Sequence, residues 1–262
     1  MPDKGTLKKV TKVGSGDTSS GTRTFTPSDE NKAKAKQFRI FAIISWVIAI
    51  GFEIGAIILL QKAQFGEAWS STSTWLIVLI VLDLIFAVAG SLLWKKANRL
   101  DPASEKDKVR FFIQNQLGAI IAMIAFLPLV ILIFTNKDIK GKQKGILGAV
   151  AVVALLIAGI SGIDFNPPSQ EQYAEQTAQV EDLTGVNKVY FTKYGRRYHL
   201  YQDCPHINTE RTDEIFEAGT VADARGKYSK ITGLCKTCEA RAVKDKGKIP
   251  DITKTIKEKE EE

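Results

Sequence analysis

The chain has 262 residues, a formal net charge of +7 and an apolar content of 45%, which is enough for one large domain or two small ones. Its apolar residues are concentrated between residues 38 and 163, whereas the first 37 residues and the stretch after residue 163 are polar. This distribution excludes a uniformly soluble globular protein and is typical of a membrane protein with soluble ends.

The N-terminal segment, residues 1–37, is rich in lysine, glycine, serine and threonine and lacks the apolar pattern of a folded core. We therefore expect a disordered basic tail. The first apolar segment starts only at residue 38, and no small-residue cleavage site follows it. The sequence therefore predicts that this segment is kept as a membrane anchor and is not removed as a signal peptide.

Four apolar segments follow, and each has about the 20 residues that a helix needs to cross a hydrocarbon core of roughly 30 Å. The predicted transmembrane helices are residues 38–60, 75–94, 111–134 and 145–163. Trp69, Trp75 and Trp94 lie at the ends of the second segment, where membrane proteins place aromatic side chains. Pro128 is expected to kink the third segment. The predicted fold class is a membrane α-helical bundle with four transmembrane helices, followed by a small C-terminal α+β zinc-binding module.

Lysine and arginine residues near the segment ends predict the orientation, because cytoplasmic loops carry an excess of them. Residues 20–39 hold five, the loop 61–74 holds one and the loop 95–110 holds six. Four crossings would place the four lysines after the third segment outside, whereas a re-entrant third segment would place them inside and export the C-terminus. We prefer four crossings of the plasma membrane, with the N-terminus and the C-terminal module in the cytoplasm.

Two carboxyl groups, Glu53 and Asp83, fall inside the predicted helices. A carboxylate in hydrocarbon is costly and therefore marks a candidate functional site. No lysine or arginine lies at the same depth, so we expect the two groups to be protonated, hydrogen-bonded to side chains such as Gln114 or Ser91, or bound to a cation. One interpretation is an interhelical hydrogen bond that locks the bundle, and the other is ion or proton handling.

The polar C-terminal part is expected to contain four pieces of secondary structure. The predicted organisation is a helical connector at 164–187, a zinc-binding module at 188–245 and a charged tail at 246–262. Alternating residues around Tyr194 and Gly195 predict a β-hairpin. Residues 210–227 are expected to be partly helical, with Thr220 as a cap, and a short helix is expected from Glu239.

Every cysteine and histidine of the chain lies in this module. Cys235 and Cys238 have the two-residue spacer that lets two thiolates face one metal ion, and His199 and Cys204 would supply the other two ligands of a tetrahedral zinc site. His206 is the alternative histidine ligand, but His199 ends a predicted strand that would hold its ring in place. A redox or disulfide role for the cysteines and a chance grouping are the other interpretations.

We expect the zinc to be structural rather than catalytic. A module of some 55 residues has a small core, and bound zinc would supply folding energy on the order of 10 kcal/mol. Four protein ligands also leave no open position for a reactive water.

The motifs of this region resemble those of the metal-binding domain of the Ada DNA-repair protein, a zinc module also found on some bacterial nucleases and membrane proteins. The matching residues are Val189, Tyr190, Thr192, Gly195, Tyr198, His199, Cys204, Cys235 and Cys238. Leu234 stands where the family often has proline, and the stretch near 208–219 is longer than usual. The resemblance implies zinc binding and implies no enzymatic activity. It does not extend to the four helices.

The charged residues indicate which kinds of partner the chain could bind. The basic residues Lys95, Lys96 and Arg99 suit anionic lipid headgroups at a bilayer surface. Residues 188–245 hold 11 basic and eight acidic residues, too mild an excess for a nucleic-acid surface. No nucleotide-binding loop or nucleophilic triad is present, and two histidines leave few groups for acid–base catalysis, so we do not expect an enzyme.

The sequence thus predicts an integral membrane protein whose zinc module tethers or recognises a protein partner, and it leaves homo-oligomerisation open. One alternative is a small ion or proton transporter or channel that uses Glu53 and Asp83. Another is a membrane-bound metal or redox sensor.

Overall fold

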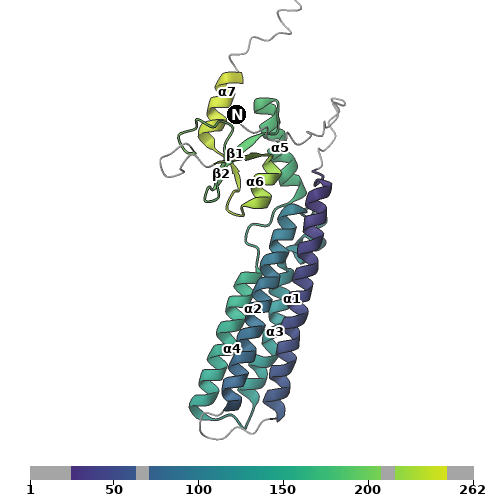
Figure 1. Cartoon of the computed structure of the whole chain (residues 1–262), viewed down its shortest axis with the longest axis vertical. Helices are drawn as coiled ribbons and strands as arrows, with labels where there is room; N and C mark the ends of the chain where they lie inside the picture. Colours follow the sequence, from purple (N-terminus) through teal and green to yellow (C-terminus); the bar gives the residue numbers. More distant parts are fainter. Residues whose placement is uncertain (1–24, 63–70, 208–215, 247–262) are drawn as a thin grey trace, which may run out of the picture.

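The computed structural model describes residues 25–62, 71–207 and 216–246. Four long helices lie side by side, and a smaller region of helices and short strands covers one end of them (Figure 1). The long helices are α1 (Asp29–Lys62), α2 (Ser71–Leu100), α3 (Lys108–Thr135) and α4 (Gly141–Gly162). All four are long and apolar enough to cross a membrane, as the sequence predicts.

Helix α1 begins within the segment that was expected to be a disordered tail. Ser28 accepts a hydrogen bond from the Asn31 amide through its hydroxyl, and Asp29 and Glu30 place negative charge at the positive end of the helix. These local signals start the helix ahead of residue 38. Residues 1–24 of the predicted tail, Trp69 and most of the predicted charged tail lie outside the described residues.

Helix α3 is one continuous helix of 28 residues that includes Pro128. At about 1.5 Å per residue it is roughly 42 Å long, and it packs on α4, α2 and α1. The bundle is therefore made of four neighbouring helices that alternate in direction, and α3 does not fold back on itself.

Small residues and backbone contacts hold the bundle together. The Trp46 indole donates to the Ala87 carbonyl at 3.3 Å, and the Ser45 hydroxyl donates to the Phe86 carbonyl at 2.7 Å, which fixes α1 on α2. Between α3 and α4, Gly162 lies directly on the backbone of Gly118. Such close approach of two backbones gives the helices favourable van der Waals contact.

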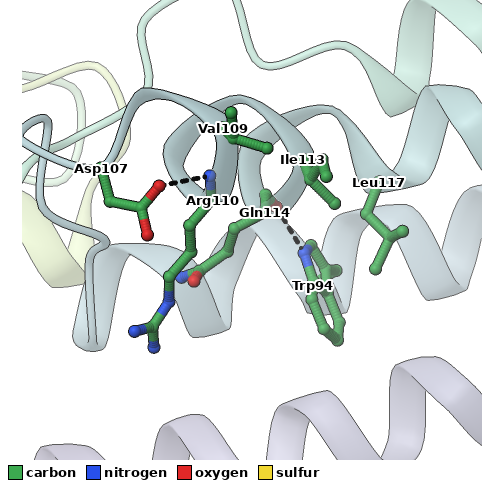
Figure 2. A pocket seen from close by; sticks show the side chains of 7 residues that line it. All are labelled: Trp94, Asp107, Val109, Arg110, Ile113, Gln114 and Leu117. Carbon is green, nitrogen blue, oxygen red and sulfur yellow. Dashed lines mark hydrogen bonds between the residues drawn. The ribbon is translucent and has the colours of Figure 1, made fainter.

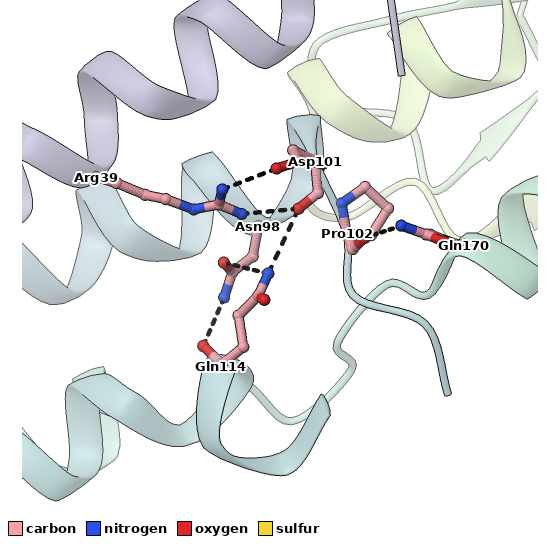
Figure 3. Close-up of polar contacts among 6 residues, drawn as sticks. All are labelled: Arg39, Asn98, Asp101, Pro102, Gln114 and Gln170. Carbon is pink, nitrogen blue, oxygen red and sulfur yellow. Dashed lines mark hydrogen bonds and ion pairs between the residues drawn. The ribbon is translucent and has the colours of Figure 1, made fainter. Parts of the chain in front are cut away.

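The start of α1, the α2–α3 connection and the end of α4 all meet at the end that carries the C-terminal region (Figure 1). The Arg39 guanidinium bonds the Asp101 carboxylate at 2.8 Å (Figure 3). The Gln116 amide donates to the Asp164 carbonyl, and the Gln170 amide donates to the Pro102 carbonyl. These contacts place the N-terminal part of α1 and the C-terminal region on the same side of the bundle.

The C-terminal region contains short strands and three helices. They are α5 (Gln170–Thr184), β1 (Val189–Phe191), β2 (Arg197–Tyr198), β3 (Glu217–Gly219), α6 (Val221–Lys227), β4 (Gly233–Leu234) and α7 (Lys236–Lys246). Strand β1 pairs antiparallel with β3, and β2 pairs parallel with β4. The expected hairpin is reduced to a single antiparallel bridge between Tyr190 and His199, because β1 takes β3 as its main partner.

The helices of this region follow local signals closely. Thr220 and Asp223 form a capping box at the start of α6, as the predicted cap at Thr220 requires. Helix α5 occupies the predicted connector and contributes Val180 to the same buried cluster as Val189 and Cys204, so the connector is part of the folded unit. Helix α7 begins before Glu239. Residues 208–215 of the expected insert lie outside the described residues.

The C-terminal region is fixed to the end of α2. The Tyr173 hydroxyl donates to the Arg99 carbonyl at 3.0 Å. The Arg225 guanidinium lies 4.8 Å from the centre of the Tyr173 ring and is itself buried. A side chain at Gly226 would press on Leu100, so the α6 backbone sits close against α2.

The contact between α3 and α4 gives a first prediction. A Cβ on Gly162 would collide with the backbone of Gly118 and Ala119, so Gly162→Ala should force the helices apart at a cost of about 1–3 kcal/mol. Thermal unfolding of the purified full chain in detergent measures it. Gly159→Ala is the matched control, since its Cβ would meet no atom within 4 Å. Equal melting temperatures for the two variants would contradict this packing.

Candidate metal centre

Four separate elements deliver the four predicted ligands to one point. His199 directly follows β2 and exchanges two backbone hydrogen bonds of 2.7 Å with Tyr190, which holds it as part of a ladder. Cys204 lies in a turn, and its backbone amide donates to the Tyr201 carbonyl. Cys235 directly follows β4, and Cys238 lies in the first turn of α7. The strand pairing of β2 with β4 therefore brings the histidine and the CxxC pair together.

The ligand atoms form a compact, buried group. One atom from each of the four residues lies within 4.8 Å of the other three. His199 Nδ1 is 3.3 Å from Cys204 Sγ and 3.7 Å from Cys238 Sγ. Exposed fractions range from 1% for Cys238 to 6% for His199 and Cys235. This set of soft donors facing one point can hold a metal ion.

The structure separates the two histidines. His199 belongs to the cluster, whereas the Nε2 of His206 lies 3.0 Å from the Thr237 hydroxyl and His206 is not part of the group. The backbone explains the difference, because the carbonyl of Cys204 accepts from the Ile207 amide and this turn carries His206 away from the sulfurs.

Burial and backbone donors shape the proton affinities of the cluster. Burial, together with the charge of His206, lowers the pKa of His199 to about 4, so its ring is neutral and free to donate a lone pair. Burial raises the pKa of Cys238 to about 12. For Cys235, burial acts in the same direction but the amides of Cys238 and Thr237 outweigh it and lower the pKa. A metal ion arriving here must therefore displace a proton from Cys238.

All three cysteines are free thiols. Their burial leaves little sulfur surface for an oxidant or a thiol exchange partner, whereas redox-active cysteines are partly exposed. The arrangement therefore favours a metal-binding role for the sulfurs over a redox role.

The two carboxyl groups, Glu53 on α1 and Asp83 on α2, are buried residues of helices that pack against each other. Glu53 is 4% exposed and Asp83 is 1% exposed, and the two are near enough to interact electrostatically. None of their four oxygens has a hydrogen-bond partner among the described residues. Such groups are costly in an apolar interior unless they are protonated or bound to a ligand.

The expected hydrogen bonds from Gln114 or Ser91 to these carboxyl groups are not present. The Ser91 hydroxyl donates to the Ala87 carbonyl of its own helix. The Gln114 amide donates to Asn98 and to the Asp101 carbonyl near the end of the bundle (Figure 3). Both side chains bond partners close to them in space. Their position along the predicted helices does not indicate these partners.

The comparisons with known proteins assign no family. Neither protein-family models, nor curated proteins, nor solved structures give a match. The functional assignment must therefore come from the chemistry of the sites.

The geometry predicts which replacements remove the metal. The full chain purified in detergent should carry one metal ion, and Cys204→Ser or Cys235→Ser should lose it because each takes away a donor atom. Elemental analysis by mass spectrometry gives the metal content per chain. His206→Ala is the control and should keep the metal, since its ring lies outside the cluster. Metal that survives loss of Cys204 but not of His206 would refute the ligand set.

Proposed function

We propose that this chain is a multi-pass membrane protein whose zinc-stabilised C-terminal module recognises a protein partner at the cytoplasmic membrane surface. The observation that carries the proposal is the buried group of His199, Cys204, Cys235 and Cys238, placed in a small module that is itself fixed to the end of a four-helix apolar bundle.

Zinc fits the donor set best. With zinc–sulfur bonds of about 2.3 Å and a zinc–nitrogen bond of about 2.0–2.1 Å, tetrahedral ligand atoms lie about 3.4–3.8 Å apart. The two sulfur distances of His199 Nδ1, 3.3 and 3.7 Å, are close to this spacing. The resemblance of the motifs to the Ada-like metal-binding domain supports the same ion. Four protein donors make the site structural, because no coordination position is left for a substrate.

The proposed orientation follows from the charges at the two ends of the bundle. The module end collects the basic residues of the first part of α1 and of the last turns of α2, including Arg39, Lys95, Lys96 and Arg99. An excess of lysine and arginine favours the cytoplasmic side. The protein would then be a plasma-membrane protein with both the N-terminal part and the module in the cytoplasm.

The exposed side of α7 is the proposed recognition surface. A shallow groove of about 610 Å³ runs along it, lined by Lys236, Thr237, Ala240, Arg241, Lys244 and Asp245. Arg241 is paired with Asp203 and Asp245, whereas the cations of Lys236 and Lys244 make no ion pair with a described residue and favour an acidic segment of the partner. Cys238 anchors this helix from its buried side, so a metal ion at the cluster would hold the groove in shape.

Site-specific photo-crosslinking tests this function. A photoreactive residue at Ala240 or Lys244 of the full chain should give a discrete adduct with one cytoplasmic or membrane protein in cells. The adduct should disappear with Cys235→Ser, because loss of the metal would disorder α7. The same label at Tyr194, which is 78% exposed but outside the groove, is the control. A folded, metal-loaded chain that gives no adduct at either α7 position would refute the assignment, and an exported partner would reverse the orientation.

A second candidate function has one observation in its favour. The four unpartnered oxygens of Glu53 and Asp83 are a site where a proton or a monovalent cation would be stabilised. Along α2, however, Leu76 and Ile80 fill the buried face between Asp83 and the distant end of the bundle. This apolar stretch argues against a transport path. It favours the interpretation that the two carboxyl groups are protonated and help to pack the helices.

Reconstitution separates the two functions. Proteoliposomes that contain the full chain should show no more proton, sodium or potassium flux than empty liposomes, and Glu53→Gln with Asp83→Asn should alter only thermal stability. Fluorescent dyes for pH and for each cation report the flux. A flux carried by the wild-type chain and abolished by the two amide replacements would support the transporter instead.

A further inference from the structure

A two-part groove lies at the module end of α3, outside the metal cluster and away from the carboxyl pair. Its apolar part has a volume of about 460 Å³ and is lined by residues that include Trp94, Ile113 and Leu117. A smaller polar pocket of about 140 Å³ adjoins it, and the two share Asp107, Arg110 and Gln114. The shared residues join the two parts into one site with an apolar end and a polar end, and Figure 2 shows the residues that line the apolar part.

The lining residues follow one stripe of the helix. Leu117, Ile113, Arg110 and Asp107 are separated by three or four positions, so they lie one above another along the α3 face, about one turn apart. Figure 2 shows this order, from the leucine at one end to the aspartate at the other. Apolar contact, positive charge and negative charge therefore succeed one another from the middle of the bundle towards its end.

Two charges of this site are without charged partners. The Arg110 guanidinium makes no hydrogen bond and no ion pair with any described residue, although it stands beside the groove. The Asp107 carboxylate uses one oxygen to accept the Arg110 amide at 3.0 Å and forms no ion pair within the described chain. The nearby Arg39 is already bonded to Asp101 (Figure 3), so it adds no free charge.

The polar pocket keeps one carboxylate oxygen open. Asp101, Pro102 and Asp107 are among its lining residues. The Asp101 carbonyl already accepts from Arg39 and Gln114, and the Pro102 carbonyl accepts from Gln170. The second oxygen of the Asp107 carboxylate accepts no hydrogen bond from a described residue, so a positively charged group with N–H donors fits beside it.

Trp94 marks the level of the site. Its indole N–H donates to the Gln114 carbonyl at 2.7 Å, while the ring forms one wall of the apolar part. Tryptophan with one polar and one apolar side is typical of the boundary between headgroups and acyl chains. The apolar part would then face acyl chains and the polar part would face headgroups.

We propose that this groove binds one phospholipid whose headgroup carries both a phosphate and a primary ammonium group. Its acyl chain lies along Ile113 and Leu117, the Arg110 guanidinium binds its phosphate, and the ammonium group donates to the Asp107 carboxylate. The order of these groups along α3 is the order of the parts of such a lipid. The inference rests on the proposed insertion of the bundle in a membrane and adds a specific lipid to it.

Lipid retention on the full chain tests the proposal. The chain is equilibrated with phosphatidylethanolamine, phosphatidylcholine and phosphatidylglycerol of matched acyl chains in equal amounts, and native mass spectrometry counts what remains bound. One phosphatidylethanolamine per chain should be retained about tenfold over each of the other two, the order of one charge-assisted hydrogen bond. The choline lipid lacks N–H donors and the glycerol lipid lacks the cation.

Two variants assign the contacts. Arg110→Gln should lower retention of phosphatidylethanolamine about tenfold. Asp107→Asn keeps an N-cap and should keep binding while it abolishes the preference over phosphatidylcholine. Lys108→Gln is the control, because this cation lies on the same turn but lines neither part of the groove.

Three outcomes would overturn the proposal. They are retention of the three lipids in equal amounts, a preference for phosphatidylglycerol that depends on Arg110, and a preference that both variants leave unchanged. Extraction of membranes with alkaline carbonate tests the premise separately. A chain that stays in the membrane but shows no lipid preference refutes the groove and leaves the proposed function standing, whereas a chain that is extracted refutes the insertion itself.

Discussion

The packing of Tyr173 between the end of α2 and the α6 helix holds the two parts of the chain in one arrangement. Its hydroxyl donates to the Arg99 carbonyl, and the Arg225 guanidinium covers its ring at 4.8 Å. Burial raises the pKa of the phenol to about 12, so it remains a neutral donor at any physiological pH. Because this contact joins the module to the bundle, the candidate metal cluster lies at the same end as the basic residues of α2 and the α3 groove.

The apolar helices and the grouping of His199 with the three cysteines could be predicted from sequence because their signals are local or chemically rare. A run of about 20 apolar residues has few other interpretations, and three cysteines and two histidines in one short region restrict the possible donors. The choice of His199 over His206 followed from one argument, that a strand end would hold the ring. In the structure, the backbone bridge between Tyr190 and His199 holds this residue in place.

Contacts between distant segments could not be predicted in the same way. Strand β1 prefers β3 to the expected hairpin partner, and nothing in either three-residue strand indicates that choice. The contacts of Arg225 depend on the packing of α5 against α6. The polar sequence of the connector does not predict this packing. The groove at Arg110 could not be predicted, because a single arginine at a helix start resembles any other basic loop residue. Only the apolar side chains that line the groove beside it distinguish this position.

The buried guanidinium of Arg225 fixes α6 on α5. It is 3% exposed, donates to the amide oxygens of Gln172 and Gln176, and has no ion pair with any described residue. Its planar set of donors matches these oxygens in one orientation only, and separating α6 from α5 would leave a buried charge without partners. Because Tyr173 of α5 also bonds the end of α2 and the α6 backbone lies against Leu100, the two helices form one stiff base between the module and the bundle. Under the proposed function, a protein bound to α7 would therefore be held in a fixed orientation relative to the bundle.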